Sequence, residues 1–184
     1  NAQNILSPGH LIEENGFSYI GPIDGHDISS LNKVLGNLRN KSGPILLHVI
    51  TKKGKGYKIA EQDPIKYHGV TPFNVKTGVS DKPKTPKMLT FTNIFSKWIN
   101  HAASNNSNFV AITPAMREGS GLVEFEQKFP SRFFDVGIAE QHSVTLAAGI
   151  AIGGLKPIVA IYSTFLQRAF DQLVHDVNLQ NLDV

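Results

Sequence analysis

The sequence predicts an α/β protein whose open, mostly parallel sheets are flanked by helices. The first observation is that Ile45–Ile50 and Phe109–Thr113 are short apolar runs, which are typical of strands buried on both faces of a parallel sheet. The second is that helical patterns alternate with such runs and are joined to them by short loops. The third is a change of composition after residue 70, which divides the pattern into two parts.

The composition excludes several classes of protein. A chain of 184 residues with 41% hydrophobic and 18% charged residues can bury one good core or two small ones. Its net charge of +3 would help to attract phosphorylated small molecules but is too small to indicate nucleic acid. The absence of cysteine excludes disulfides and thiolate metal sites. No apolar run approaches the ~20 residues that span a bilayer. We therefore expect no nucleic-acid partner and no membrane.

The ends of the sequence resemble those of an internal fragment. The chain starts at Asn1 without methionine, and we expect a new apolar strand to start at Leu182–Val184. We therefore expect this chain to be part of something longer.

The first part of the chain predicts a strand–helix–strand unit. A short helix is expected over His10–Tyr19 and closes near Gly16. The turn-forming residues of Gly21–Asp27 predict a turn, and a second helix then leads to the strand Ile45–Ile50. Apolar positions of that helix are Leu31, Val34, Leu35 and Leu38, and its candidate caps are Asp27, Ser29 and Ser30.

A basic, glycine-rich loop follows this strand at its carboxyl end. The loop Thr51–Lys58 is either a flexible basic loop or an anion cradle of glycine amides and ammonium groups, and it lacks the spacing of a P-loop. His68, beside an aromatic residue and a glycine, is equally open between an ordinary loop residue and a functional one. Residues 73–88 hold prolines and lysines with few large apolar residues, which predicts a linker.

The second part restarts a strand and helix alternation. The expected order is a helix that starts near Thr90 or Thr92, a strand, a short helix, a strand that ends at Gly137, a helix of small residues, a third strand and a third helix. The apolar face of the first helix is Phe91, Ile94, Phe95, Trp98, Ile99 and Ala102. The later elements are Phe109–Thr113, Leu122–Phe129, Phe133–Gly137, Val144–Gly153, Pro157–Tyr162 and Thr164–Leu179.

Parallel strands would gather their carboxyl-end loops on one edge of the sheet, where ligands bind. Two interpretations are open for Glu140 there: an acidic residue stabilised by the helix dipole, or a functional carboxylate. Arg168 is either a surface residue paired with a nearby carboxylate or a ligand contact, and Phe165 either packs in the core or faces a ligand. The expected edge residues are Met116, Arg117, Ser120, Glu140, Gln141, His142, Tyr162, Phe165 and Arg168.

Long motifs of this chain resemble those of the 1-deoxy-D-xylulose-5-phosphate synthases, in the same order and at close to the same spacing. The resemblance covers essentially the whole chain. Two small departures, Phe170 for a common tyrosine and Asp183 for a common proline, touch none of the roles given below. The motifs are Tyr19–Asp27, Thr51–Tyr57, Pro114–Gly121, Asp135–His142 and Tyr162–Ala169.

The resemblance implies a transketolase-like transferase that depends on thiamine diphosphate. Such an enzyme condenses pyruvate with D-glyceraldehyde 3-phosphate, releases carbon dioxide and forms 1-deoxy-D-xylulose 5-phosphate for isoprenoid, thiamine and pyridoxal synthesis. It also implies a homodimer, a cytoplasmic location, or a plastid one in a plant or alga, and Mg²⁺ whose ligands lie outside this chain. By the same resemblance, residues 1–72 end the diphosphate-binding domain, and residues 89–184 begin the pyrimidine-binding domain. This piece alone is expected to be inactive, because half of the cofactor site is absent.

The resemblance also implies site residues. Glu140 matches the glutamate that hydrogen-bonds the cofactor's aminopyrimidine ring and favours its imino tautomer. Other positions against the cofactor are Lys53, Tyr57, Ile138 and Phe165; His68 matches a histidine that faces the reacting carbon; and Tyr162 and Arg168 match a pair that binds the aldehyde and its phosphate.

Three other functions stay open beside this one. The chain could belong to another transketolase-like enzyme, to the β-subunit type of a 2-oxo acid dehydrogenase, or to a non-catalytic module that binds a phosphorylated ligand. The motif Tyr162–Ala169 argues against the first two.

Overall fold

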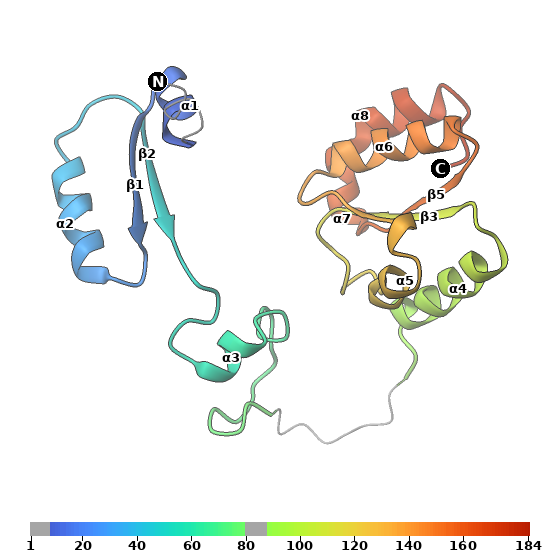
Figure 1. Cartoon of the computed structure of the whole chain (residues 1–184), viewed down its shortest axis with the longest axis horizontal. Helices are drawn as coiled ribbons and strands as arrows, with labels where there is room; N and C mark the ends of the chain where they lie inside the picture. Colours follow the sequence, from blue (N-terminus) through green and yellow to red (C-terminus); the bar gives the residue numbers. More distant parts are fainter. Residues whose placement is uncertain (1–7, 80–87) are drawn as a thin grey trace. The chain divides into compact units, whose positions relative to one another are not determined.

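The computed structural model describes residues 8–79 and 88–184. They form two compact units, Asn1–Pro83 and Lys84–Val184, and each is described by itself (Figure 1). The boundary between the two units, after Pro83 in the sequence, lies within the predicted linker of residues 73–88. The assignment of 1–72 and 89–184 to two cofactor-binding domains stays a prediction.

The first unit contains the predicted strand–helix–strand arrangement. Strands β1 (Ser18–Asp24) and β2 (Ile45–Ile50) are parallel, helix α2 (Ile28–Leu38) connects them, and α1 (Pro8–Glu14) packs on β1. Asp27 is the cap of α2, because its Oδ1 accepts a hydrogen bond of 3.0 Å from the backbone N–H of Ser30. The hydroxyl and amide of Ser30 also lower the pKa of the Asp27 carboxyl.

Two expectations for this unit are wrong. The predicted turn Gly21–Asp27 is strand as far as Asp24, with a register shift between Ile20 and Ile23. Gly21 has φ +134°, and a Cβ there would lie 2.5 Å from the carbonyl oxygen of His48, so the close approach of β2 requires this glycine. Strand β2 is only half-buried, since the described sheet of this unit has two strands.

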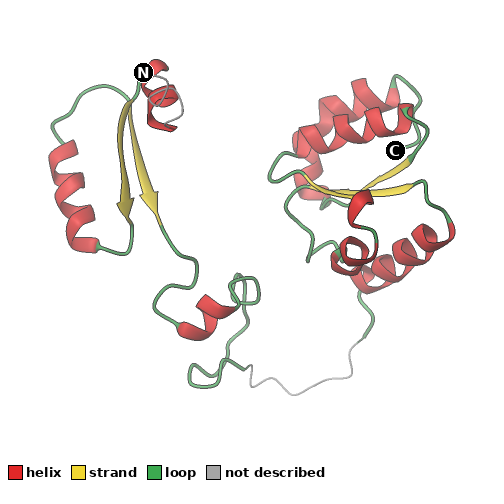
Figure 2. Cartoon of the chain, in the orientation of Figure 1, coloured by secondary structure: helices red, strands yellow, loops and turns green. Residues whose placement is uncertain are grey.

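The short helix α3 (Lys58–Gln62) follows the basic loop (Figure 2). An aromatic cluster packs the loop residues on either side of this helix together. The rings of Tyr57, Tyr67 and Phe73 lie 5.3–6.0 Å apart between centroids. Both tyrosine hydroxyls donate to backbone carbonyls, Tyr57 to Val75 at 2.8 Å and Tyr67 to Gly78 at 2.6 Å. The described start of the predicted linker therefore packs on the loop before it, and residues 80–87 lie outside the described residues.

The second unit has the predicted parallel sheet flanked by helices, which lie on both of its faces (Figure 1). The order of its three strands is β4-β3-β5. Alternate residues of β3 divide the core. Ala111 packs with α4 and α5, whereas Val110 and Ile112 pack with Ala147 of α6. The elements are α4 (Phe91–Asn105), β3 (Phe109–Thr113), α5 (Val123–Lys128), the 3₁₀ turn Pro130–Arg132, β4 (Phe133–Asp135), α6 (Glu140–Ile152) and β5 (Lys156–Val159).

The structure confirms one prediction about a helix of the second unit and contradicts another. Thr90, one of the two candidates, caps α4 in a capping box with Asn93. The single helix expected over Thr164–Leu179 is wrong, because Ala169 leaves the helical region at φ −109°, ψ 23°. The segment is instead α7 (Ser163–Leu166), the 3₁₀ turn Gln167–Ala169, α8 (Phe170–Gln172) and the π-helical turn Leu173–Asn178.

Packing on α6 explains the broken path of this segment. Ala169 and Val177 are buried against Val144 and Ala148 of α6, whereas the apolar side chain of Phe170 is exposed. Tertiary contacts thus outweigh the periodicity here. Within residues 8–79 and 88–184, no helix is both long and apolar enough to span a bilayer.

Candidate active site at the carboxyl edge of the second sheet

Hydrogen bonds join the loops that leave β3 and β5. The hydroxyls of Thr113 and Ser120 both donate to the carbonyl of Ala160, at 3.0 and 3.1 Å. The Tyr162 hydroxyl donates to the carbonyl of Gly119 at 3.3 Å. Ser120, which was expected to face a ligand, is buried. Its hydrogen bond to Ala160 instead helps to hold the two loops together.

Asp135, the last residue of β4, ties the loop after β3 to the turn after β4. Its Oδ1 accepts hydrogen bonds from the backbone N–H groups of Ala115 at 2.9 Å and Gly137 at 3.0 Å. Ala115 has φ +56°, a conformation that residues other than glycine adopt rarely. The carboxylate of Asp135 therefore stabilises a strained backbone at the edge of the sheet.

We expect Asp135→Ala to lower the free energy of unfolding of the second unit by about 1–2 kcal/mol, because two backbone donors lose a charged acceptor. Asp135→Asn keeps the Oδ1 acceptor and should lose less than half of that. Urea unfolding followed by the fluorescence of Trp98, the single tryptophan and a residue of α4, reports on this unit alone. Asp183→Ala, at an exposed aspartate, is the matched control; equal effects at the two positions would contradict the role of Asp135.

Glu140 is the first residue of α6, and it is buried although its side chain ends in a carboxyl group. Its side chain is 8% exposed, and Arg168 Nη1 lies 3.1 Å from Oε1 and 3.4 Å from Oε2. The Ser143 hydroxyl donates to the Glu140 carbonyl at 2.6 Å. The position in the first turn agrees with the helix-dipole interpretation, but that interpretation does not require burial beside an arginine.

The position of Arg168 follows from its neighbour in the sequence. Ala169 is fully buried against Val144 and Ala148, and this contact fixes the 3₁₀ turn Gln167–Ala169 on α6. The guanidinium of Arg168 then reaches the start of α6, while 60% of its side chain stays exposed. Arg168 is thus paired with a carboxylate, but with one 28 residues away rather than one helical turn away.

Exposed apolar side chains lie close to the two residues of this ion pair in the sequence. Phe165 is stacked on Tyr162, with ring centroids 6.0 Å apart and planes 9° apart. Phe165 is 38% exposed, so it does not pack in the core as the simpler interpretation required. Ile138, two residues before Glu140, is 78% exposed. The edge therefore combines a buried carboxylate with apolar surface for a flat ligand.

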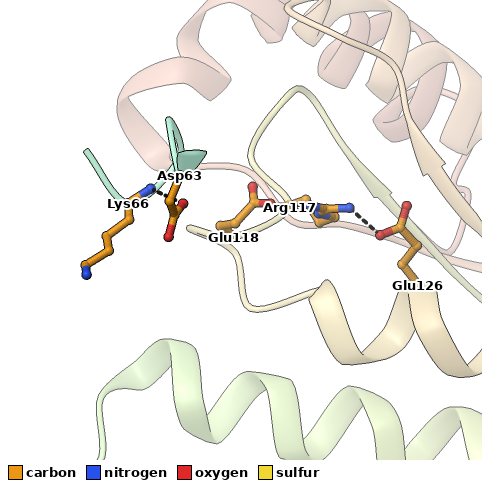
Figure 3. A network of polar contacts seen from close by, with 5 residues as sticks. All are labelled: Asp63, Lys66, Arg117, Glu118 and Glu126. Atoms are coloured by element: carbon orange, nitrogen blue, oxygen red, sulfur yellow. Dashed lines mark hydrogen bonds and ion pairs between the residues drawn. The ribbon is translucent and has the colours of Figure 1, made fainter. Parts of the chain in front are cut away.

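Arg117 was expected to face a ligand at the same edge, but its guanidinium is paired with two glutamates of the second unit. Its Nη1 donates to Glu126 at 2.6 Å and its Nε to Glu118 at 2.9 Å (Figure 3). Glu118 and Glu126 raise the pKa of the guanidinium, and Arg117 lowers the pKa of the Glu118 carboxyl. This arginine thus anchors the loop after β3 to α5.

A cavity of about 300 Å³ lies beside the edge but does not include Glu140. Phe91 and Phe95 of α4, Ser120, Ile161 and Tyr162 are among its lining residues, and the surface is mostly apolar. Among these lining residues, the tyrosine phenol is the only ionisable group that the cavity offers a ligand.

Lys53, Tyr57 and His68 lie in the first unit. Lys53 and His68 are exposed, and Tyr57 is part of the aromatic cluster. Part of the basic loop is already neutralised, because Lys52 Nζ lies 2.7 Å from Glu61 and the Gly56 N–H donates to Glu61 at 3.0 Å. Lys52 is the main cause of the lowered pKa of the Glu61 carboxyl.

The turn before His68 is also internally bonded. Asp63 accepts a hydrogen bond of 3.1 Å from the backbone N–H of Lys66 (Figure 3). In the parts of the chain that the structure describes, no three His, Asp or Glu side chains converge in a way that could hold a metal ion.

Two known families match parts of this chain. Residues 87–184 match the family described as transketolase, pyrimidine binding domain. The chain belongs to this family. Residues 1–51 match the family described as 1-deoxy-D-xylulose-5-phosphate synthase. Both matches confirm the resemblance that the motifs indicated.

Curated relatives with high sequence identity carry the same family name. The chain is 60% identical to the 1-deoxy-D-xylulose-5-phosphate synthase of Nitrosococcus oceani and 59% identical to that of an Acidovorax species, over 100% of this chain in both comparisons. It spans 29% of the length of these relatives. A solved structure, described as a split gene transketolase, inactive beta4 tetramer, is 27% identical with a TM-score of 0.45, over 49% of this chain and 30% of that one.

Proposed function

We propose that this chain forms part of a 1-deoxy-D-xylulose-5-phosphate synthase, which joins pyruvate to D-glyceraldehyde 3-phosphate with loss of carbon dioxide. The observation that carries the proposal is the buried carboxylate of Glu140 at the carboxyl edge of a parallel sheet, in a pyrimidine-binding-domain family. The high identity to synthases over the whole chain supports this substrate pair over those of other transketolase-like enzymes.

The residues at the edge fit the aminopyrimidine ring of thiamine diphosphate. A ring of this kind has flat apolar faces and nitrogen atoms at its rim, and the edge offers exposed Ile138 and Phe165 together with one buried carboxylate. Thiamine diphosphate, when bound, supplies the nucleophilic carbon and the electron sink for the condensation. Glu140 would hold the proton shared with the ring nitrogen, and Phe165 would pack on the ring face.

The other predicted residues complete the proposal. Tyr162 and Arg168 would bind the aldehyde and its phosphate, for which a guanidinium is well suited. Lys53 and Tyr57 would lie near the cofactor, and His68 would assist proton transfer at the reacting carbon. Mg²⁺, with ligands outside this chain, and a homodimeric assembly belong to the same proposal.

A full-length protein that carries this sequence tests the function. We expect it to form 1-deoxy-D-xylulose 5-phosphate and carbon dioxide from pyruvate and D-glyceraldehyde 3-phosphate only when thiamine diphosphate and Mg²⁺ are added. Product formation is measured by mass spectrometry and by release of labelled carbon dioxide from [1-¹⁴C]pyruvate. Transfer of a two-carbon unit from a ketose phosphate, with no use of pyruvate, would favour a transketolase and contradict the proposal.

A further inference from the structure

We propose that Arg168 competes with the cofactor ring for Glu140, and that it moves to the phosphate of the aldehyde substrate when the site is loaded. This inference rests on the proposed function and adds a second role to Arg168. In the free chain the guanidinium lies against both carboxylate oxygens, at 3.1 and 3.4 Å. The arginine is therefore bound to an internal anion before any ligand arrives.

Burial makes the two partners of Glu140 mutually exclusive. The protein covers all but 8% of the glutamate side chain, so a ligand can reach the carboxylate only through its small solvent-facing opening. Arg168 contacts both carboxylate oxygens, and 60% of its own side chain is exposed to solvent. A ring nitrogen that bonds the carboxylate must therefore displace the guanidinium.

Among the described residues, the side chain of Arg168 hydrogen-bonds only Glu140, so it can move once that partner is exchanged. Its backbone is fixed through Ala169, but the side chain is long and mostly exposed. The exposed guanidinium can pass to a competing anion, and a ring nitrogen that bonds Glu140 in its place keeps the buried carboxylate from being left without a partner. A phosphate group offers the guanidinium a bidentate partner of at least equal quality.

The competition predicts that loss of the arginine tightens cofactor binding. In a full-length protein with this sequence, Arg168→Ala should lower the Kd of thiamine diphosphate by about 2- to 5-fold, the effect of removing a weak ion pair. Isothermal titration with Mg²⁺ present measures this Kd without any turnover. Arg168→Lys, which keeps the charge, should stay near the wild type, and Lys128→Ala, in a surface pair with Glu124, should change nothing.

Linkage gives a second, independent readout. A phosphate ligand that draws Arg168 away from Glu140 must strengthen cofactor binding, and the cofactor must strengthen phosphate binding by the same factor. Glycerol 3-phosphate, which lacks the reacting aldehyde, should therefore lower the Kd of thiamine diphosphate a few-fold in the wild type. The same probe should have no effect in Arg168→Ala.

Two results would overturn the competition. One is weaker cofactor binding in Arg168→Ala, which would make the arginine a support for Glu140. The other is an unchanged Kd together with no effect of glycerol 3-phosphate. In the Glu140→Gln background the Arg168→Ala effect should disappear. Normal turnover in Glu140→Gln alone would instead remove the carboxylate from the chemistry, which separates failure of the proposed function from failure of this inference.

Discussion

Replacement of Glu140 by glutamine in a full-length synthase with this sequence is expected to lower turnover by about 10²-fold or more. Positioned groups that transfer protons contribute on this scale. Glutamine keeps the size of the side chain and fits the same buried space, so the change removes the ionisable carboxyl and leaves the packing of α6 intact. Steady-state kinetics with both substrates saturating measures the loss.

The matched control for this prediction is Glu124→Gln on α5. Glu124 is an exposed residue paired with Lys128, so its replacement should leave turnover within about 2-fold. Circular dichroism of both variants shows whether they fold. A Glu140→Gln enzyme that turns over like the wild type would remove Glu140 from the proposed mechanism.

Replacement of Arg168 by alanine is expected to raise the KM for D-glyceraldehyde 3-phosphate by about 10- to 100-fold. This factor corresponds to the loss of charge-assisted hydrogen bonds to a phosphate, about 1.5–3 kcal/mol. The KM for pyruvate, which has no phosphate, should change little. Arg168→Lys should lie between the two enzymes, because an ammonium group is a point charge without the bidentate geometry.

D-Glyceraldehyde, the substrate analogue without phosphate, is the control for this assignment. The wild type and Arg168→Ala should use it with the same KM, because neither enzyme can gain from a phosphate contact that the ligand lacks. If the variant shows an unchanged KM for D-glyceraldehyde 3-phosphate, Arg168 does not bind the substrate phosphate.

Most of the helices and strands could be predicted because the residues that determine them are close together in the sequence. Strand Ile45–Ile50 and the cap at Asp27 are encoded by neighbours within a few residues. Gly21 was misinterpreted for a physical reason: a glycine that permits a turn and a glycine that permits close approach of His48 look alike in a sequence. Only the pairing with β2 distinguishes them.

The candidate site shows the same limit. The position of Glu140 in a turn at the carboxyl edge of the sheet could be predicted, because a strand, which ends at Asp135, precedes that turn. The partner of the Glu140 carboxylate could not be predicted, since Arg168 is 28 residues away in the sequence. Arg168 reaches the carboxylate only because Ala169 interrupts the helix. Asp135 was likewise overlooked; an aspartate two residues before a glycine was the available signal.

The small side chains of α6 have a consequence for which substitutions the protein can accept. Ser143, Val144, Ala147 and Ala148 are almost completely buried between the sheet and the C-terminal segment. A larger residue at any of them would force the two layers apart and displace the helix that begins with Glu140. The residues near the carboxylate that are hardest to replace thus lie one and two helical turns after Glu140 in α6. An activity screen would record losses at these residues although they touch no ligand.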